Sequence, residues 1–124
     1  MKSVVLSGSF KDWEDLRRTC QRIITLDMLC HWPKYETPRY EEDMSREEMA
    51  TALSEHLKRI VVSDAMYVVN PTGYIGKGVS FEIGYAHALG KPIFSQKDVS
   101  EVFLRSAIIT VVPIERLADE LERL

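Results

Sequence analysis

The stretch NPTGYIGKGVSFEIGYAHALGKPIF, residues 70–94, decides the fold of this chain. Its first part is rich in glycine and polar residues, which is typical of a loop. A helical pattern follows over 78–89 and stops at Gly90, a residue type favoured just after a helix end. One apolar run, 65–69, precedes this helical segment, and another, 92–95, follows it. Strand, loop, helix and strand in this order predict a βαβ unit, in which the two strands are parallel.

The same alternation continues on both sides of this unit. SVVLS at 3–7 is a short apolar run that ends in Ser-Gly-Ser, and SREE at 45–48 is a capping box that opens a long helix. The remaining expected elements are helices over 12–25, 46–61, 100–106 and 114–124, strands over 26–32 and 107–112, and a polar loop with two prolines over 33–43. Five strands that alternate with helices predict a single α/β domain over residues 1–124. Its five-stranded parallel sheet carries helices on both faces, as in a flavodoxin- or Rossmann-like three-layer sandwich with strand order 2-1-3-4-5.

The composition is that of an ordinary soluble domain. Charged residues make up 28% of the 124 residues, and a net charge of −3 argues against a nucleic-acid-binding surface. The apolar runs are far shorter than the ~20 residues that span a bilayer, and the first residues lack the apolar core of a signal peptide. We therefore expect a cytoplasmic protein that binds neither membrane nor nucleic acid. Cys20 and Cys30 lack the spacing of a metal site, so no bound metal is expected.

A ligand site in such a sheet lies at the carboxyl ends of the strands, near the switch point between the first and third strands. Two segments leave the sheet there. The residues suited to binding are Ser7, Gly8, Ser9 and Phe10 in the first segment, and Asn70, Gly73, Tyr74, Gly76, Gly78 and Ser80 in the second. Ser80 has two open interpretations, as the N-cap of the next helix or as an anion ligand at its start. Asp64 precedes the third strand at the opposite edge, and we interpret it as a structural turn or cap residue.

Glu82 is a carboxylate in an unexpected place. At about 100° per residue, the helical phase places it on the same inward arc as Val79, Ile83, Ala86 and Leu89. A first-turn Glu that pointed outward would be an ordinary capping or helix-dipole residue. Its inward phase beside a glycine-rich loop favours a functional role instead. The small residues Gly84 and Ala86 are expected to let this helix sit close against a neighbouring element.

His56 raises a similar question in the preceding helix. It lies within the expected apolar stripe formed by Met49, Leu53, Leu57 and Ile60. Most histidines in such a position are satisfied core residues. The spacing therefore leaves a core role and a site role open.

Three segments give the chain a resemblance to a known family. SGSF after the first strand, HLKRIVVSDAMYVVNPTGYIG over 56–76 and above all GVSFEIGYAHALGKPIF over 78–94 resemble the nucleoside 2-deoxyribosyltransferase-like superfamily. That group includes nucleoside 5′-monophosphate N-glycosidases. The resemblance covers most of the chain and implies that Glu82 is the catalytic nucleophile. Gly76 and His56 stand where the well-known transferases carry Asp, and a short branch with a His and GYIG pattern is more similar.

The resemblance implies cleavage or transfer at the N-glycosidic bond of a nucleoside or nucleoside 5′-monophosphate, through a covalent glycosyl-Glu82 intermediate. Such chemistry needs a second group to handle the proton, and His56, Tyr74 and the acidic residues 41–43 are the candidates. Backbone amides around Gly8, Ser9 and Ser80 are candidates for holding a 5′-phosphate. No metal or organic cofactor is implied. The transferases build each site across a subunit interface, so a homodimer or larger homo-oligomer is implied as well.

Other functions remain open at this level. The absence of an acid at Gly76 favours a non-catalytic nucleotide-binding or sensing module on the same fold. A flavin carrier or a receiver domain shares the topology, but a receiver requires acidic residues at strand ends where this chain has Ser-Gly-Ser. An NAD glycosidase is a further alternative, because it also can use a Glu.

Overall fold

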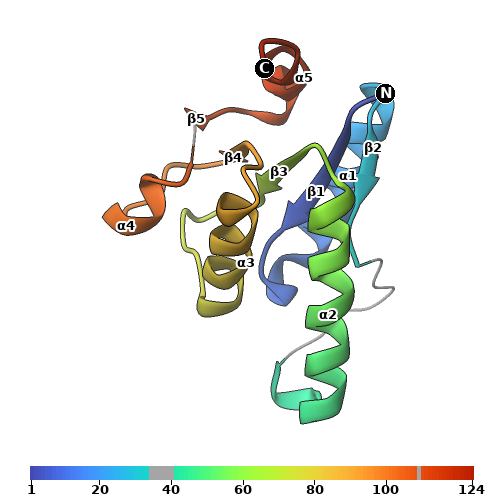
Figure 1. Ribbon diagram of the computed structural model, residues 1–124, viewed down its shortest axis with the longest axis vertical. Coiled ribbons are helices and arrows are strands. Elements are labelled where there is room, and N and C mark those ends of the chain that lie inside the picture. Colours follow the sequence, from blue (N-terminus) through green and yellow to red (C-terminus); the bar gives the residue numbers. More distant parts are fainter. Residues whose placement is uncertain (34–40, 109) are drawn as a thin grey trace.

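The computed structural model describes residues 1–33, 41–108 and 110–124. Its five strands form one parallel sheet in the order β2-β1-β3-β4-β5, which confirms the predicted topology (Figure 1). The strands are β1 (Ser3–Ser7), β2 (Leu29–His31), β3 (Ala65–Val68), β4 (Ile93–Ser95) and β5 (Thr110–Val111). The second and fifth strands are shorter than predicted. Residues 34–40 of the predicted loop lie outside the described residues.

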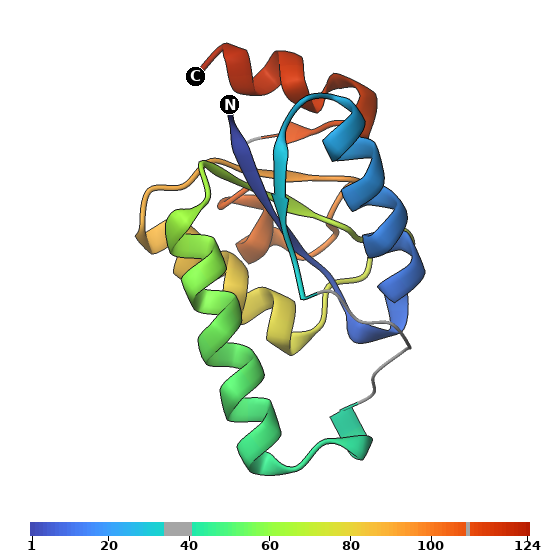
Figure 2. The same ribbon diagram turned by 90° about the vertical axis from the view of Figure 1, so that its right-hand side faces the viewer.

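Helices cover both faces of the sheet, as predicted (Figure 2). The helices are α1 (Trp13–Thr25), α2 (Arg46–Val62), α3 (Lys77–Ala88), α4 (Val102–Arg105) and α5 (Leu117–Glu122), with single 3-10 turns η1 (Phe10–Asp12), η2 (Glu41–Asp43) and η3 (Ile114–Arg116). Side chains of α1 and α5 pack with one face of the sheet, and those of α2, α3 and α4 pack with the other. No helix in the described part of the chain is both long and apolar enough to cross a membrane.

Helix α2 is longer than the sheet that it covers. The predicted capping box is formed, because Ser45 Oγ accepts from the Glu48 amide and the Glu48 carboxylate accepts from the Ser45 amide. Seventeen residues of helix extend ~25 Å at 1.5 Å per residue, whereas a five-residue strand extends ~17 Å. The first turns of α2 therefore run past the sheet (Figures 1 and 2). This corrects the predicted apolar stripe, since Leu53 is 41% exposed while His56 and Ile60 are buried.

Helix α3 corrects three further expectations about its ends and packing. It begins at Lys77 with Gly76 as N-cap, so Ser80 lies inside the helix and is not a cap. A Cβ at Gly84 would have no neighbour within 4 Å, so this glycine does not serve close packing. The predicted end is confirmed, because Gly90 has a φ of +72° and its amide bonds back to the carbonyl of His87. Leu89 is half-exposed at this end and lies outside the core.

Asp64 joins the start of β3 to the start of β1, at the edge of the sheet opposite the predicted site. Its Oδ2 accepts hydrogen bonds from the Ser3 amide at 2.8 Å and from the Ser3 hydroxyl at 3.2 Å. The backbone hydrogen bond lowers the pKa of Asp64 below its ordinary value of 3.8, and the charges of Lys2 and Lys91 act in the same direction. The structural interpretation of Asp64 fits these contacts.

We expect Asp64→Asn to lower the free energy of unfolding at pH 7 by about 1 kcal/mol or less, because Asp64 is exposed and solvent screens its charge. The pKa of Asp64 is lower in the folded state than in the unfolded state. The ionised carboxylate therefore stabilises the fold fully at pH above the unfolded-state pKa, and this stabilisation is lost as the pH falls through the folded-state pKa. Urea unfolding of both proteins between pH 7 and pH 2.5 measures this. The difference between them should shrink below about pH 4. A difference that stays constant down to pH 2.5 would contradict the assignment.

Candidate active site

Three elements bring one polar side chain each to a common point. Ser7 ends β1, His56 lies on α2 and Glu82 lies on α3. The Ser7 hydroxyl donates to Glu82 Oε1 at 2.7 Å, and His56 Nε2 lies 2.9 Å from the same oxygen. The two candidate catalytic residues of the sequence, Glu82 and His56, are therefore in contact. Ser7 belongs to this cluster as well, as a partner of the Glu82 carboxylate.

The backbone explains how these side chains meet. Ser7 pairs with Val68 in the parallel ladder, and its carbonyl accepts from the Val69 amide at 2.8 Å, so its position is fixed at the carboxyl end of a central strand. Glu82 precedes Ile83, which is fully buried on the inner side of α3. His56 lies one turn before the fully buried Ile60 on α2. Each of the three is held by the packing of its own element.

The cluster is nearly enclosed. The side chain of His56 is 8% exposed and that of Glu82 is 17% exposed. A carboxylate that loses this much water requires polar partners, which Ser7 and His56 supply. The ring N–H of His56 does not point along the line to Oε1, and neither ring nitrogen has an aligned hydrogen bond among the described residues. Catalytic hydrogen bonds often align only when a ligand is bound.

The turn after β1 is tightly packed. A Cβ at Gly8 would lie 3.0 Å from the Val69 carbonyl oxygen and 3.1 Å from Leu16 Cδ2, so a side chain there would require these neighbours to shift by a few tenths of an ångström. Ser9 is the N-cap of η1 and accepts from the Lys11 amide at 3.3 Å. Phe10 is the first residue of η1 and is partly exposed. This predicted binding segment lies at the same edge of the sheet as Glu82.

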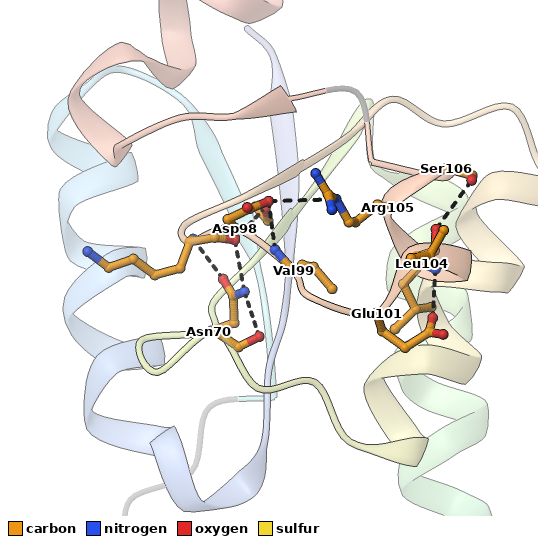
Figure 3. A network of polar contacts seen from close by, with 11 residues as sticks. Asn70, Asp98, Val99, Glu101, Leu104, Arg105 and Ser106 are labelled. Carbon is orange, nitrogen blue, oxygen red and sulfur yellow. Dashed lines mark hydrogen bonds and ion pairs between the residues drawn. The ribbon is translucent and has the colours of Figure 1, made fainter.

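Asn70 has a structural role in the loops above the sheet. Its Oδ1 accepts from the Lys97 amide at 2.9 Å, and its Nδ2 donates to the Lys97 carbonyl at 3.0 Å and towards the Gly73 carbonyl at 3.5 Å. Figure 3 shows this amide between the loops after β3 and β4, near Asp98 and Arg105. The side-chain amide is thus committed to backbone groups. These contacts link the loops after β3 and β4, and the role of Asn70 in binding stays a prediction.

The loop from β3 to α3 holds the other predicted binding residues. Gly73 has a φ of +86° and closes a turn with Asn70, so glycine is needed there. Tyr74 is 74% exposed, and its ring lies beside Gly76. Gly78 is the second residue of α3 and not part of a loop. The hydroxyl and amide of Ser80 both bond to the Gly76 carbonyl, at 2.7 Å and 3.0 Å, so neither faces a ligand as a free donor.

Two features of this edge lay beyond the sequence interpretation. The contact of Ser7 with Glu82 joins residues 75 positions apart, and no local pattern encodes it. Asp12, the N-cap of α1, lies two residues after the SGSF segment and is not among the predicted site residues. Burial, followed by the charge of Asp15, raises the pKa of Asp12. Within the described ranges, no group of three or more His, Cys, Asp or Glu side chains is arranged to hold a metal ion.

Comparison with known proteins identifies the fold. No family model matches the chain, and a search of curated proteins finds no match. Solved structures do match. A conserved protein from Enterococcus faecalis V583 superimposes with a TM-score of 0.66 at 17% identity, covering 99% of this chain and 98% of that one. A 2-deoxyribosyltransferase from Bacillus psychrosaccharolyticus superimposes with a TM-score of 0.65 at 19% identity, covering 89% of this chain and 85% of that one.

The fold is nucleoside 2-deoxyribosyltransferase-like. The similarity extends over nearly the full length of both chains, so it concerns the whole α/β architecture and not a shared βαβ unit. It confirms the resemblance at the level of the fold. At this level of identity, the residues of the site rest on their own geometry.

The packing of Gly8 can be tested against a glycine that has no neighbours. We expect Gly8→Ala to lower the free energy of unfolding by about 1–3 kcal/mol, because the new Cβ crowds the Val69 carbonyl and Leu16. Gly84→Ala should raise it by about 0.5–1 kcal/mol, because alanine is the better helix former and its Cβ meets open space. Chemical denaturation of the two variants and the wild type measures both. Equal effects of the two substitutions would contradict the described packing.

Proposed function

We propose that this chain cleaves or transfers at the N-glycosidic bond of a nucleoside or nucleoside 5′-monophosphate, with Glu82 as the nucleophile. The observation that carries the proposal is the position of the Glu82 carboxylate. It lies at the carboxyl edge of the sheet, is largely enclosed, and is contacted by the Ser7 hydroxyl and by Nε2 of His56. A carboxylate with a purely structural role keeps its hydration when it lies on the surface, whereas burial removes that hydration. The solved 2-deoxyribosyltransferase with the same fold supports a nucleoside substrate.

The proposed reaction proceeds in two displacements. A Glu82 oxygen attacks the anomeric carbon while the bond from that carbon to the base nitrogen breaks, through an oxocarbenium-like transition state. The electron pair of the broken bond leaves with the base, which takes up a proton. The resulting glycosyl ester of Glu82 is then attacked by water in a hydrolase or by a second base in a transferase. Both outcomes retain the configuration of the anomeric carbon, and neither requires a metal or organic cofactor.

The substrate would lie over the loops that leave β1 and β3. Ser9 and Phe10 in η1 and the exposed ring of Tyr74 are the proposed contacts, and an aromatic ring offers a stacking surface for a base. A 5′-phosphate would be held by amides near Gly8 and Ser9, because the Ser80 amide is already bonded within α3. Assembly into a homodimer or larger homo-oligomer is part of this proposal, as the resemblance to the transferases implies.

A second function is a nucleotide-binding module without catalysis. One observation favours it. Gly76, which stands where the transferases carry an acid, is the N-cap of α3 and offers no side chain to protonate or bind a substrate. The module would bind the same nucleosides or nucleotides and release no base.

The two functions are separated by a panel of nucleosides, 2′-deoxynucleosides and their 5′-monophosphates, with the released base followed by chromatography. We expect base release by the wild type from at least one member, and base exchange when a second free base is added if the chain is a transferase. Including NAD in the panel and following nicotinamide release tests the glycosidase alternative.

Glu82→Gln should lower base release at least ~10³-fold, because an amide cannot form the ester. Glu55→Gln is the matched control, since Glu55 is exposed on α2, one residue before His56. It should keep the wild-type rate. If the wild type binds a nucleotide but releases no base from any member, the binding module is the correct function. Full activity of Glu82→Gln would exclude Glu82 as nucleophile.

A further inference from the structure

We propose that Ser7 and His56 are positioning residues that hold Oε1 of Glu82, so that Oε2 is the oxygen that attacks the substrate. This inference rests on the proposed function, with Glu82 as nucleophile, and assigns its two neighbours a role. It also removes His56 from the candidates for the group that protonates the base. His56 orients the nucleophile and does not protonate the departing base.

Both neighbours contact one and the same oxygen. Ser7 Oγ lies 2.7 Å from Oε1 and His56 Nε2 lies 2.9 Å from it. Among residues 1–33, 41–108 and 110–124, none forms a hydrogen bond or ion pair with Oε2. The hydrogen bond from the Ser7 hydroxyl and the imidazole nitrogen at 2.9 Å, both on one oxygen, restrict the rotation of the carboxylate. The second oxygen keeps its lone pairs for attack, and the side chain retains 17% exposure at an otherwise enclosed site.

Ser7 and His56 both lie in buried regular secondary structure. Ser7 is 1% exposed and lies in the ladder between β1 and β3. His56 is 7% exposed on α2, in the same core layer as α3 and one turn from Ile60. A nucleophile held by side chains on a strand and a helix is placed more precisely than one held by loops. Such placement reduces the motion needed to reach the transition state.

The geometry of His56 argues against the role of general acid. Nε2 is the nitrogen nearest the nucleophile, 2.9 Å from Oε1, so a proton carried there lies beside the carboxylate and not beside the departing base. Nδ1, on the opposite side of the ring, is buried and has no hydrogen-bond partner in the described part of the chain, so it is not exposed to a base on the open side of the site. Ser7, a neutral hydroxyl, donates to the same carboxylate.

Kinetics of four variants test the positioning role. Ser7→Ala and His56→Ala should each lower base release at saturating substrate by about 10–100-fold with little change in KM, because the carboxylate is misplaced and substrate binding is retained. Ser7→Thr keeps a hydroxyl and His56→Gln keeps a donor near Nε2, so both should retain most of the rate. Ser95→Ala and His87→Ala are controls for loss of a buried hydroxyl and of an exposed imidazole. Ser7→Ala at the wild-type rate would overturn the assignment of Ser7.

A change of leaving group separates positioning from acid catalysis. 7-Methylguanine departs from its nucleoside without protonation, whereas guanine requires a proton. Positioning predicts that His56→Ala loses the same factor with guanine and 7-methylguanine nucleosides. If the loss disappears with 7-methylguanine, or if His56→Gln is as inactive as His56→Ala, His56 is the general acid and the proposal is wrong.

A spectroscopic experiment tests the contact on Oε1 independently of the proposed function. The imidazole ¹⁵N shifts of His56 should change in Glu82→Gln and stay unchanged in Glu55→Gln, because His56 Nε2 contacts Glu82 alone of the two. If the wild type releases no base and these shifts change as expected, the proposed function fails while the shared contact on Oε1 stands. If Glu82→Gln leaves the shifts unchanged, the shared contact is refuted whatever the activity.

Discussion

The contact of Ser7 and His56 with one oxygen of Glu82 is the constraint on which the site depends. A carboxylate with 17% exposure loses most of its hydration and is tolerated when donors replace the lost water. Here the Ser7 hydroxyl donates from β1 and the His56 imidazole lies alongside from α2, while the carboxylate comes from α3. The cluster therefore links three elements that are distant in the sequence. Any change in how α2 and α3 sit on the sheet would move the Glu82 carboxylate, the proposed nucleophile, relative to its partners.

The fold creates this meeting point through its topology. In the order β2-β1-β3-β4-β5, the chain adds β2 on one side of β1 and the later strands on the other side. The segments that follow β1 and β3 therefore diverge and leave space at the carboxyl edge. Ser7 closes β1 at that edge and Glu82 lies in the second turn of the helix that follows β3. The opposite edge is closed by Asp64 and Ser3. The Asp64 contacts and the Ser7–Glu82 contact thus lie at opposite ends of the same strands.

Much of this arrangement could be predicted from local patterns. The alternation of strands and helices gave the topology, and helical phase placed Glu82 on the inner side of α3. The errors have physical causes. Ser80 has the chemistry of a cap, but Gly76 begins the helix and the Ser80 hydroxyl bonds back to it. Leu53 fits an apolar stripe, but α2 outruns the sheet and leaves this side chain exposed. The partnership of Ser7 and Glu82 depends on the fold as a whole, and no spacing encodes it.

The most direct test of the central claim is to detect the covalent intermediate on Glu82. The substrate found to be cleaved would be prepared as its 2′-fluoro analogue, in which fluorine destabilises the oxocarbenium-like transition states and slows turnover. Mass spectrometry of the intact protein and of its peptides then reports the site of attachment. We expect one added glycosyl group on the peptide that contains Glu82, and none in Glu82→Gln. Base release without any adduct, or an adduct on another residue, would contradict the account.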